Sequence, residues 1–185
     1  MKRQPHRQKM DKPANAYIPQ EYIHKLQAQA RYVWMIVVAV VALWLALIVL
    51  PAIFAGLGYT SIASPIYSFF GFLCHQIPER SFHIFGHQLA VCSRCFGVYC
   101  GLLFGLLIYP VWRSMDNIEP LPRVWLFLSL IPITVDWSLT IFGIWENTHL
   151  SRFITGSLLG FACACYILPA VIEIKRNYSI AALKK

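Results

Sequence analysis

The chain is poor in charged residues. Only 13% of its 185 residues are Asp, Glu, Lys or Arg, whereas a soluble domain carries about 25%. Hydrophobic residues make up 58% of the sequence, and the mean hydropathy is +0.56. A soluble fold of this size could not bury so much apolar surface, so the expected solvent of the chain is the lipid bilayer.

Several signatures of common protein classes are missing. There is no P-loop, no G-x-S-x-G elbow, no H-E-x-x-H motif and no dinucleotide fingerprint. The six cysteines are too few and too unevenly spaced for a small secreted disulfide scaffold. No histidine lies inside an expected spanning segment, which argues against a b-type cytochrome. The first residues do not resemble a cleavable signal peptide, because the apolar run behind them has full membrane length.

Four apolar segments are long enough to cross a bilayer, which takes about 20 mostly apolar residues. A fifth apolar segment is too short to cross and opens at Ser64-Pro65, a favourable helix start. We therefore predict an all-α integral membrane protein with four transmembrane helices and one short half-helix or re-entrant segment. The membrane domain covers residues 32–174, with spans at 32–57, 89–112, 124–144 and 153–174 and the half-helix at 62–73.

The basic residues predict the orientation. Residues 1–31, 113–123 and 175–185 share one side if there are four crossings, and they hold 13 of the 16 Lys and Arg residues. Cytoplasmic segments are rich in Lys and Arg, so residues 1–31 and 175–185 are expected to be basic cytoplasmic tails at the cell membrane. Residues 17–30 suit an amphipathic surface helix or a partly ordered tail. Basic ends that flank apolar spans do not indicate a nucleic-acid partner.

The stretch LCHQIPERSFHIFGHQLAVCSRCFGVYCG, residues 73–101, gathers metal-binding and ionisable side chains on the expected extracytoplasmic side. Cys92 and Cys95 lie one turn apart at a helix start, where the helix dipole favours the thiolate. Together with Cys74-His75 they offer up to four ligands for a tetrahedral metal ion, zinc above all. Adjacent residues diverge on a helix, so a three-ligand set of Cys92, Cys95 and one residue of that pair is an alternative. A thiol–disulfide redox role and simple packing remain alternatives.

Two stripes of small residues predict close helix packing: Gly97-x3-Gly101-x3-Gly105 and Gly156-x3-Gly160-x3-Ala164. We expect the stripes to pack within the chain, with a homodimer as the alternative. Arg94 and Arg152 share faces with these stripes and should point into the bundle. Asp136 is their expected partner, either in a structural ion pair or in an anion-binding or catalytic pocket.

These residues lead to one functional hypothesis, a zinc-like metal site beside an anion pocket. The expected ligands are Cys74 or His75 with Cys92 and Cys95. Gln76, Arg80, Arg94 and Arg152 are expected to bind an anionic small molecule or lipid headgroup, and Glu79, Arg94 and Asp136 are the candidates for catalysis. A thiol–disulfide redox protein and a small transporter or assembly factor are the competing classes, and whether the chain is an enzyme stays open.

The motifs LCHQIPERSF and VCSRCFGVYCG, followed by Asp136 and NTHLSRFITGSLLG, resemble a family of small predicted multi-pass membrane proteins from prokaryotes. That family is a domain of unknown function with a CHQ-x-P-x-RS … C-x-RC-x-G signature. The resemblance covers roughly residues 65–160 and implies a membrane protein in which this constellation matters. It implies no activity.

Overall fold

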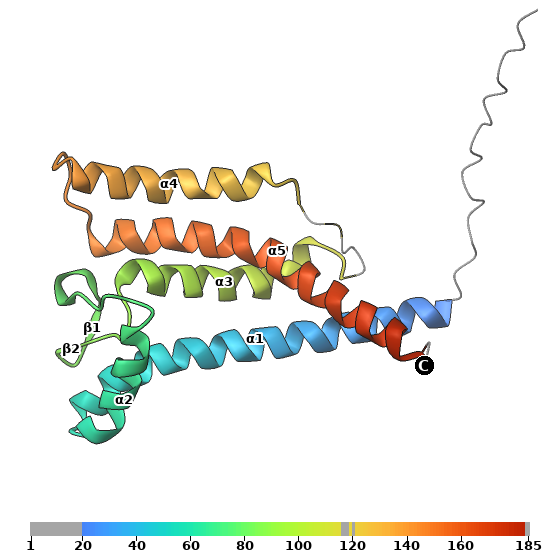
Figure 1. Cartoon of the computed structure of the whole chain (residues 1–185), viewed down its shortest axis with the longest axis horizontal. Coiled ribbons are helices and arrows are strands. Elements are labelled where there is room, and N and C mark those ends of the chain that lie inside the picture. The colour runs from blue at the N-terminus through green and yellow to red at the C-terminus, as the bar shows by residue number, and fades with distance from the viewer. Residues whose placement is uncertain (1–19, 116–118, 120, 184–185) are drawn as a thin grey trace, which may run out of the picture.

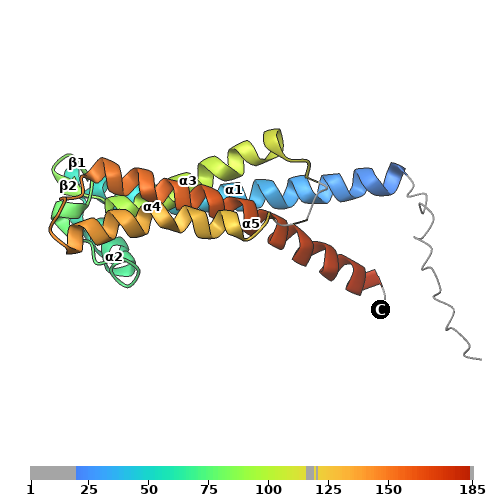
Figure 2. The same ribbon diagram turned by 90° about the horizontal axis from the view of Figure 1, so that it is seen from above.

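The computed structural model describes residues 20–115, 119 and 121–183 (Figures 1 and 2). Most of the predicted N-terminal tail, part of the 113–123 loop and the last two residues lie outside the described residues. The elements in chain order are α1 (Gln20–Gly56), α2 (Thr60–Gly71), the short 3-10 helix η1 (Pro78–Arg80), β1 (His83–Ile84), β2 (His87–Gln88), α3 (Ser93–Trp112), α4 (Val124–Ile141) and α5 (His149–Leu183).

Four of the described helices, α1, α3, α4 and α5, are long and apolar enough to cross a membrane. The predicted fold class is therefore confirmed. Helix α2 has 12 residues, which at about 1.5 Å per residue is well short of a bilayer core. The start of α1 and the end of α5 lie at the same end of the bundle, as an even number of crossings requires (Figure 1). Which end faces the cytoplasm stays a prediction.

The helices begin and end at other residues than the apolar segments do. Helix α1 already begins at Gln20, and α5 runs from His149 to Leu183. Hydropathy marks the part of a helix that is in lipid, whereas polar residues continue the same helix into water. Helix α3 begins later than the apolar pattern suggests, because Cys92 is extended, with φ −68° and ψ 161°, and acts as the N-cap.

The two small-residue stripes face each other between α3 and α5. A Cβ at Gly101 would overlap the carbonyl oxygen of Ser157, and a Cβ at Gly160 would overlap that of Val98. The Ser157 hydroxyl also donates to the carbonyl of Gly97 at 3.1 Å. The stripes are thus occupied inside the chain, and a homodimer through them would first have to separate these two helices.

Helix α4 lies at the edge of the bundle and packs against α5 (Figures 1 and 2). None of its residues is buried, whereas α3 and α5 bury their small-residue faces. At the end of the bundle opposite the chain ends, a hydrophobic core forms between α1, α2 and the segment before α3 (Figure 1). Its buried members are Ile48, Ala52, Phe70, Cys74, Leu89, Ala90 and Val91. The Cys/His stretch folds on top of this core, which fixes its position relative to α3.

Candidate metal centre and cavity

Three cysteines converge at the start of α3. Cys74 follows α2, Cys92 is the N-cap of α3, and Cys95 lies in its first turn. The three sulfur atoms all lie within 4.8 Å of one another, and Cys74 is buried. Thiolates are the preferred protein ligands of zinc, so this cluster could hold a metal ion. All six cysteines of the chain are free thiols in this structure.

The helix start stabilises negative charge on Cys74. The backbone N–H of Cys92 donates to the Cys74 sulfur at 3.2 Å. The thiols of Cys92 and Cys95 also donate to it, and these bonds lower the pKa of Cys74 although burial opposes them. No side chain caps α3, so the positive end of its helix dipole lies beside the sulfur cluster without a side-chain acceptor.

His75 is not a member of the three-sulfur group. It lies next to Cys74, is exposed, and lines the cavity described below. The backbone turns sharply here, because Gln76 has a left-handed φ of 49°. The ligand role of His75 stays a prediction.

Gln76 holds that turn in place. Its side-chain amide donates to the carbonyl oxygens of Tyr67 in α2 and Ala90 before α3, both at 2.8 Å. A residue with φ above 0° is strained unless its surroundings hold it, and these two bonds supply that support. Both amide hydrogens of Gln76 are therefore engaged by the backbone, although the side chain was predicted to bind an anion.

A cavity of about 430 Å³ opens beside the sulfur cluster. It is lined by side chains from the loop after α2 and from the facing ends of α3, α4 and α5: Leu73, Cys74, His75, Gln76, Ile77, Arg80, Cys92, Arg94, Cys95, Trp137, Thr140, Ile141, Asn147 and Arg152. The three cysteines thus share one cavity with all three predicted anion-binding arginines. Glu79 is exposed on η1 and does not line this cavity.

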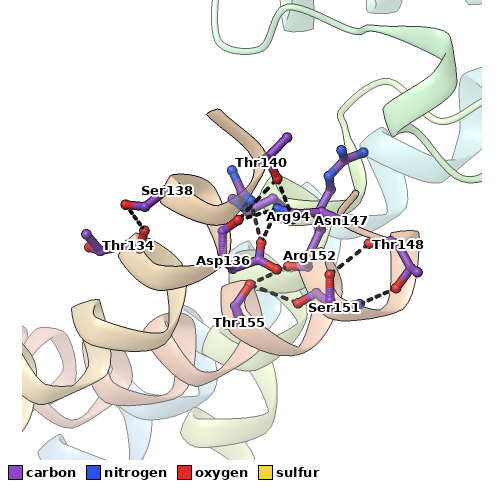
Figure 3. Close-up of polar contacts among 10 residues, drawn as sticks. All are labelled: Arg94, Thr134, Asp136, Ser138, Thr140, Asn147, Thr148, Ser151, Arg152 and Thr155. Atoms are coloured by element: carbon purple, nitrogen blue, oxygen red, sulfur yellow. Dashed lines mark hydrogen bonds and ion pairs between the residues drawn. The ribbon is translucent and has the colours of Figure 1, made fainter. Parts of the chain in front are cut away.

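The expected ion pair forms at the cavity wall (Figure 3). Arg94 donates to the Asp136 carboxylate at 2.6 Å, and both side chains are largely buried, with 23% and 10% of their surface exposed. Asn147 donates to the same carboxylate oxygen at 2.7 Å and to the Asp136 carbonyl at 2.8 Å. Thr140 in turn donates to the Asn147 side-chain oxygen. The carboxylate is therefore fixed from two sides, and it fixes the Arg94 guanidinium.

The other two arginines keep their guanidinium groups available. Among the described residues, the side chains of Arg80 and Arg152 make no hydrogen bond or ion pair. Arg80 is exposed and Arg152 is half-buried. Two free guanidiniums in one cavity are suited to bind an anion, because the planar fork matches carboxylate and phosphate oxygens.

Several polar residues that the sequence motifs did not single out hold this site together. Asn147 and Thr140 orient Asp136, as described above. Ser93 is fully buried and donates to the carbonyl of Arg80 at 2.8 Å, while its oxygen lies 2.9 Å from Nδ1 of His149. These bonds tie η1 and the starts of α3 and α5 together. Only their position in the sequence could have indicated these residues: Ser93 lies between two predicted site residues, and Asn147 lies in the turn before α5.

Comparison with known proteins places the chain in a family. Residues 74–166 match the family described as predicted membrane protein (DUF2085). The chain is 39% identical to the uncharacterized protein MJ1492 of Methanocaldococcus jannaschii over 150 residues, which are 78% of this chain and 95% of that protein.

The chain belongs to this family. The resemblance noted in its sequence motifs is confirmed.

A second relative extends the comparison. An uncharacterized protein of Methanothermobacter thermautotrophicus is 34% identical over 108 residues, 56% of this chain and 90% of that protein. No solved structure matches the chain. The family match begins at Cys74 and includes every residue that lines the cavity except Leu73. The site and the family-defining part of the chain therefore coincide.

Proposed function

We propose that this multi-pass membrane protein is a zinc-binding protein whose metal centre, Cys74, Cys92 and Cys95, acts on an anionic ligand in the adjoining cavity. The observation that carries the proposal is the convergence of three sulfur atoms within 4.8 Å from two separate segments of the chain. Sulfur ligands select zinc among the common divalent ions, and a tetrahedral site with three protein ligands keeps one position for a water or substrate oxygen. All three cysteines line the cavity, so a ligand bound in it would have access to that position.

The arginines support an anionic ligand. Arg94 is held by Asp136, whereas Arg80 and Arg152 have no side-chain partner among the described residues. An oxyanion in the cavity would be held by guanidinium forks while one of its oxygens reaches the metal. In this arrangement Asp136 is a positioning residue. Glu79, which is exposed and does not line the cavity, remains the predicted acid or base. We place the site on the extracytoplasmic side, with both termini cytoplasmic, from the distribution of basic residues.

Metal content tests the proposal directly. The protein is extracted in mild detergent without chelator or nickel affinity steps, and metals are counted by elemental mass spectrometry. We expect about one zinc per chain, as in a structural or catalytic site. Cys92→Ser should lose the metal. Cys163→Ser, which removes a half-buried thiol that belongs to no cluster, is the matched control and should keep it.

Fresh wild-type protein without stoichiometric metal would overturn the proposal. The three thiols would then be assigned to redox chemistry, which their mutual proximity also favours. In that function, Cys92 and Cys95 would reduce a partner disulfide to two thiols and become a disulfide themselves. Thiol titration before and after mild reductant distinguishes the two, because a metal centre releases zinc on oxidation and a redox pair cycles without it.

A further inference from the structure

Apolar side chains line the cavity together with its arginines. They are Leu73 and Ile77 from the loop after α2, and Trp137 and Ile141 from α4. Trp137 is 56% exposed and Ile141 58%, so the cavity is open on the α4 side. Both residues belong to the segment Val124–Ile141, which is long and apolar enough to span the bilayer. The opening therefore faces lipid as well as water.

The charged residues of the cavity lie near the ends of three segments that could span the membrane. Arg94 and Arg152 fall within the first four residues of the spanning segments Ser93–Trp112 and His149–Ser179. Asp136 precedes the end of the α4 span by five residues, or about 7.5 Å at 1.5 Å per residue. Helix ends mark the boundary between hydrocarbon and headgroups, where Arg and Trp side chains are favoured. A phosphate at the arginines would thus lie level with the phosphates of the surrounding lipids.

An apolar track leads from the cavity into the membrane. Leu130, Thr134, Trp137 and Ile141 recur at helical spacing on one face of α4, and all four are exposed. No residue of α4 is buried, so nothing in the described chain covers this face. A hydrocarbon chain lying along this face would extend from the cavity toward the bilayer centre.

We infer that the ligand of the cavity is a membrane lipid with a phosphate-monoester headgroup, which enters sideways from the bilayer. Its phosphate binds Arg80, Arg94 and Arg152, and its acyl chain lies along the α4 face just described. The inference rests on the proposed anion site and names its substrate class. A terminal phosphate offers three oxygens to three guanidiniums, which a phosphodiester such as phosphatidylcholine does not. A cavity of about 430 Å³ is suited to a headgroup rather than to a whole lipid.

Lipid retention tests the inference on the full-length protein in mild detergent. Native mass spectrometry counts bound phosphatidic acid, phosphatidylcholine or inorganic phosphate, and zinc is measured on the same samples. We expect one phosphatidic acid per chain, little phosphatidylcholine, and no displacement by excess inorganic phosphate. Arg152→Gln and Arg80→Gln should each weaken retention about tenfold or more, since each removes a charge-assisted contact. The Arg80 side chain is exposed and makes no hydrogen bond or ion pair among the described residues, so its variant should fold normally.

Two controls locate the binding. Arg123→Gln removes an exposed arginine at the other end of α4 and should leave retention unchanged. Trp137→Ala should weaken the binding of phosphatidic acid without changing the binding of inorganic phosphate, because only the lipid would contact the apolar side chains of the cavity.

The outcomes separate this inference from the proposed function. Equal retention by wild type and both arginine variants would mean annular lipid only and would overturn the inference. Arginine-dependent binding of inorganic phosphate but not of phosphatidic acid would also overturn it, while the anion site would stand. If neither anion binds although zinc is stoichiometric, the anion site and the lipid are both wrong and the metal centre stands.

Discussion

Replacing Asp136 with Asn removes the charge that holds Arg94. A guanidinium nitrogen of Arg94 lies 2.6 Å from a carboxylate oxygen of Asp136, and the two side chains are only 23% and 10% exposed. The arginine of the variant would therefore keep a largely buried charge without its partner. Breaking a buried ion pair by removing one partner costs about 3–5 kcal/mol. Arg94 retains some access to the cavity, so we expect about 3 kcal/mol, the lower end of that range.

A double-mutant cycle isolates the pair from the individual residues. Arg94→Gln alone leaves a buried carboxylate without its cation, whereas Arg94→Gln with Asp136→Asn leaves neither charge. The double variant should therefore be more stable than the two single losses predict, with a coupling of about 2–3 kcal/mol. The assay is the free energy of unfolding in mixed micelles of increasing SDS content. Glu146→Gln, an exposed acid in the neighbouring turn, is the control and should change stability by less than about 0.5 kcal/mol.

One result would refute the reasoning. If the stability losses of the two single variants add up to the loss of the double variant within about 0.5 kcal/mol, the two side chains do not depend on each other. The ion pair would then contribute nothing measurable to stability, and Asp136 would not be the residue that positions Arg94 in the cavity.

Two further predictions concern the scaffold. Gly101→Ala should lower the free energy of unfolding by about 1–3 kcal/mol or more, because the new Cβ overlaps the Ser157 carbonyl and α3 and α5 must separate. Gly71→Ala is the control, because its new Cβ would lie 3.8 Å from the nearest atom, an ordinary contact, and should be tolerated. Equal losses of stability for Gly101→Ala and Gly71→Ala in SDS unfolding would contradict the close contact between α3 and α5. Gln76→Ala should cost about 2 kcal/mol, because two hydrogen bonds to backbone carbonyls are lost and a left-handed φ remains. Gln76→Gly removes the same bonds without the strain, so a variant as unstable as Gln76→Ala in the same assay would show that strain is negligible.

The membrane helices could be predicted from the sequence because hydropathy reports them directly. A run of about 20 apolar residues has few folded alternatives to a spanning helix. Small residues at every fourth position likewise predicted close packing, since only a helix face turns that spacing into a continuous surface. The pairing of Arg94 with Asp136 followed from chemistry, because a charge at membrane depth needs a partner and few were available.

The details of the site depend on long-range contacts that local sequence does not report. Cys74 meets Cys92 and Cys95 across 18 and 21 residues of chain, and the left-handed turn at Gln76 that follows Cys74 is held by bonds to distant carbonyls. His75 and Glu79 were assigned by residue type and proximity in sequence, which do not determine side-chain direction. Asn147 is a residue type that is common in turns, and its role becomes visible only when the end of α4 lies beside it.

The charges around the cavity connect the metal to the anion. Three guanidiniums, from Arg80, Arg94 and Arg152, face one carboxylate, so these four side chains leave two positive charges in a partly apolar site. The close contact of α3 with α5 keeps Arg94 and Arg152 from moving apart, because Gly156 abuts the backbone of Arg94. A zinc ion with three thiolates contributes one net negative charge and removes half of this excess. The remaining positive charge favours an anionic ligand, so the metal centre and the ligand together offset the charge of the arginines.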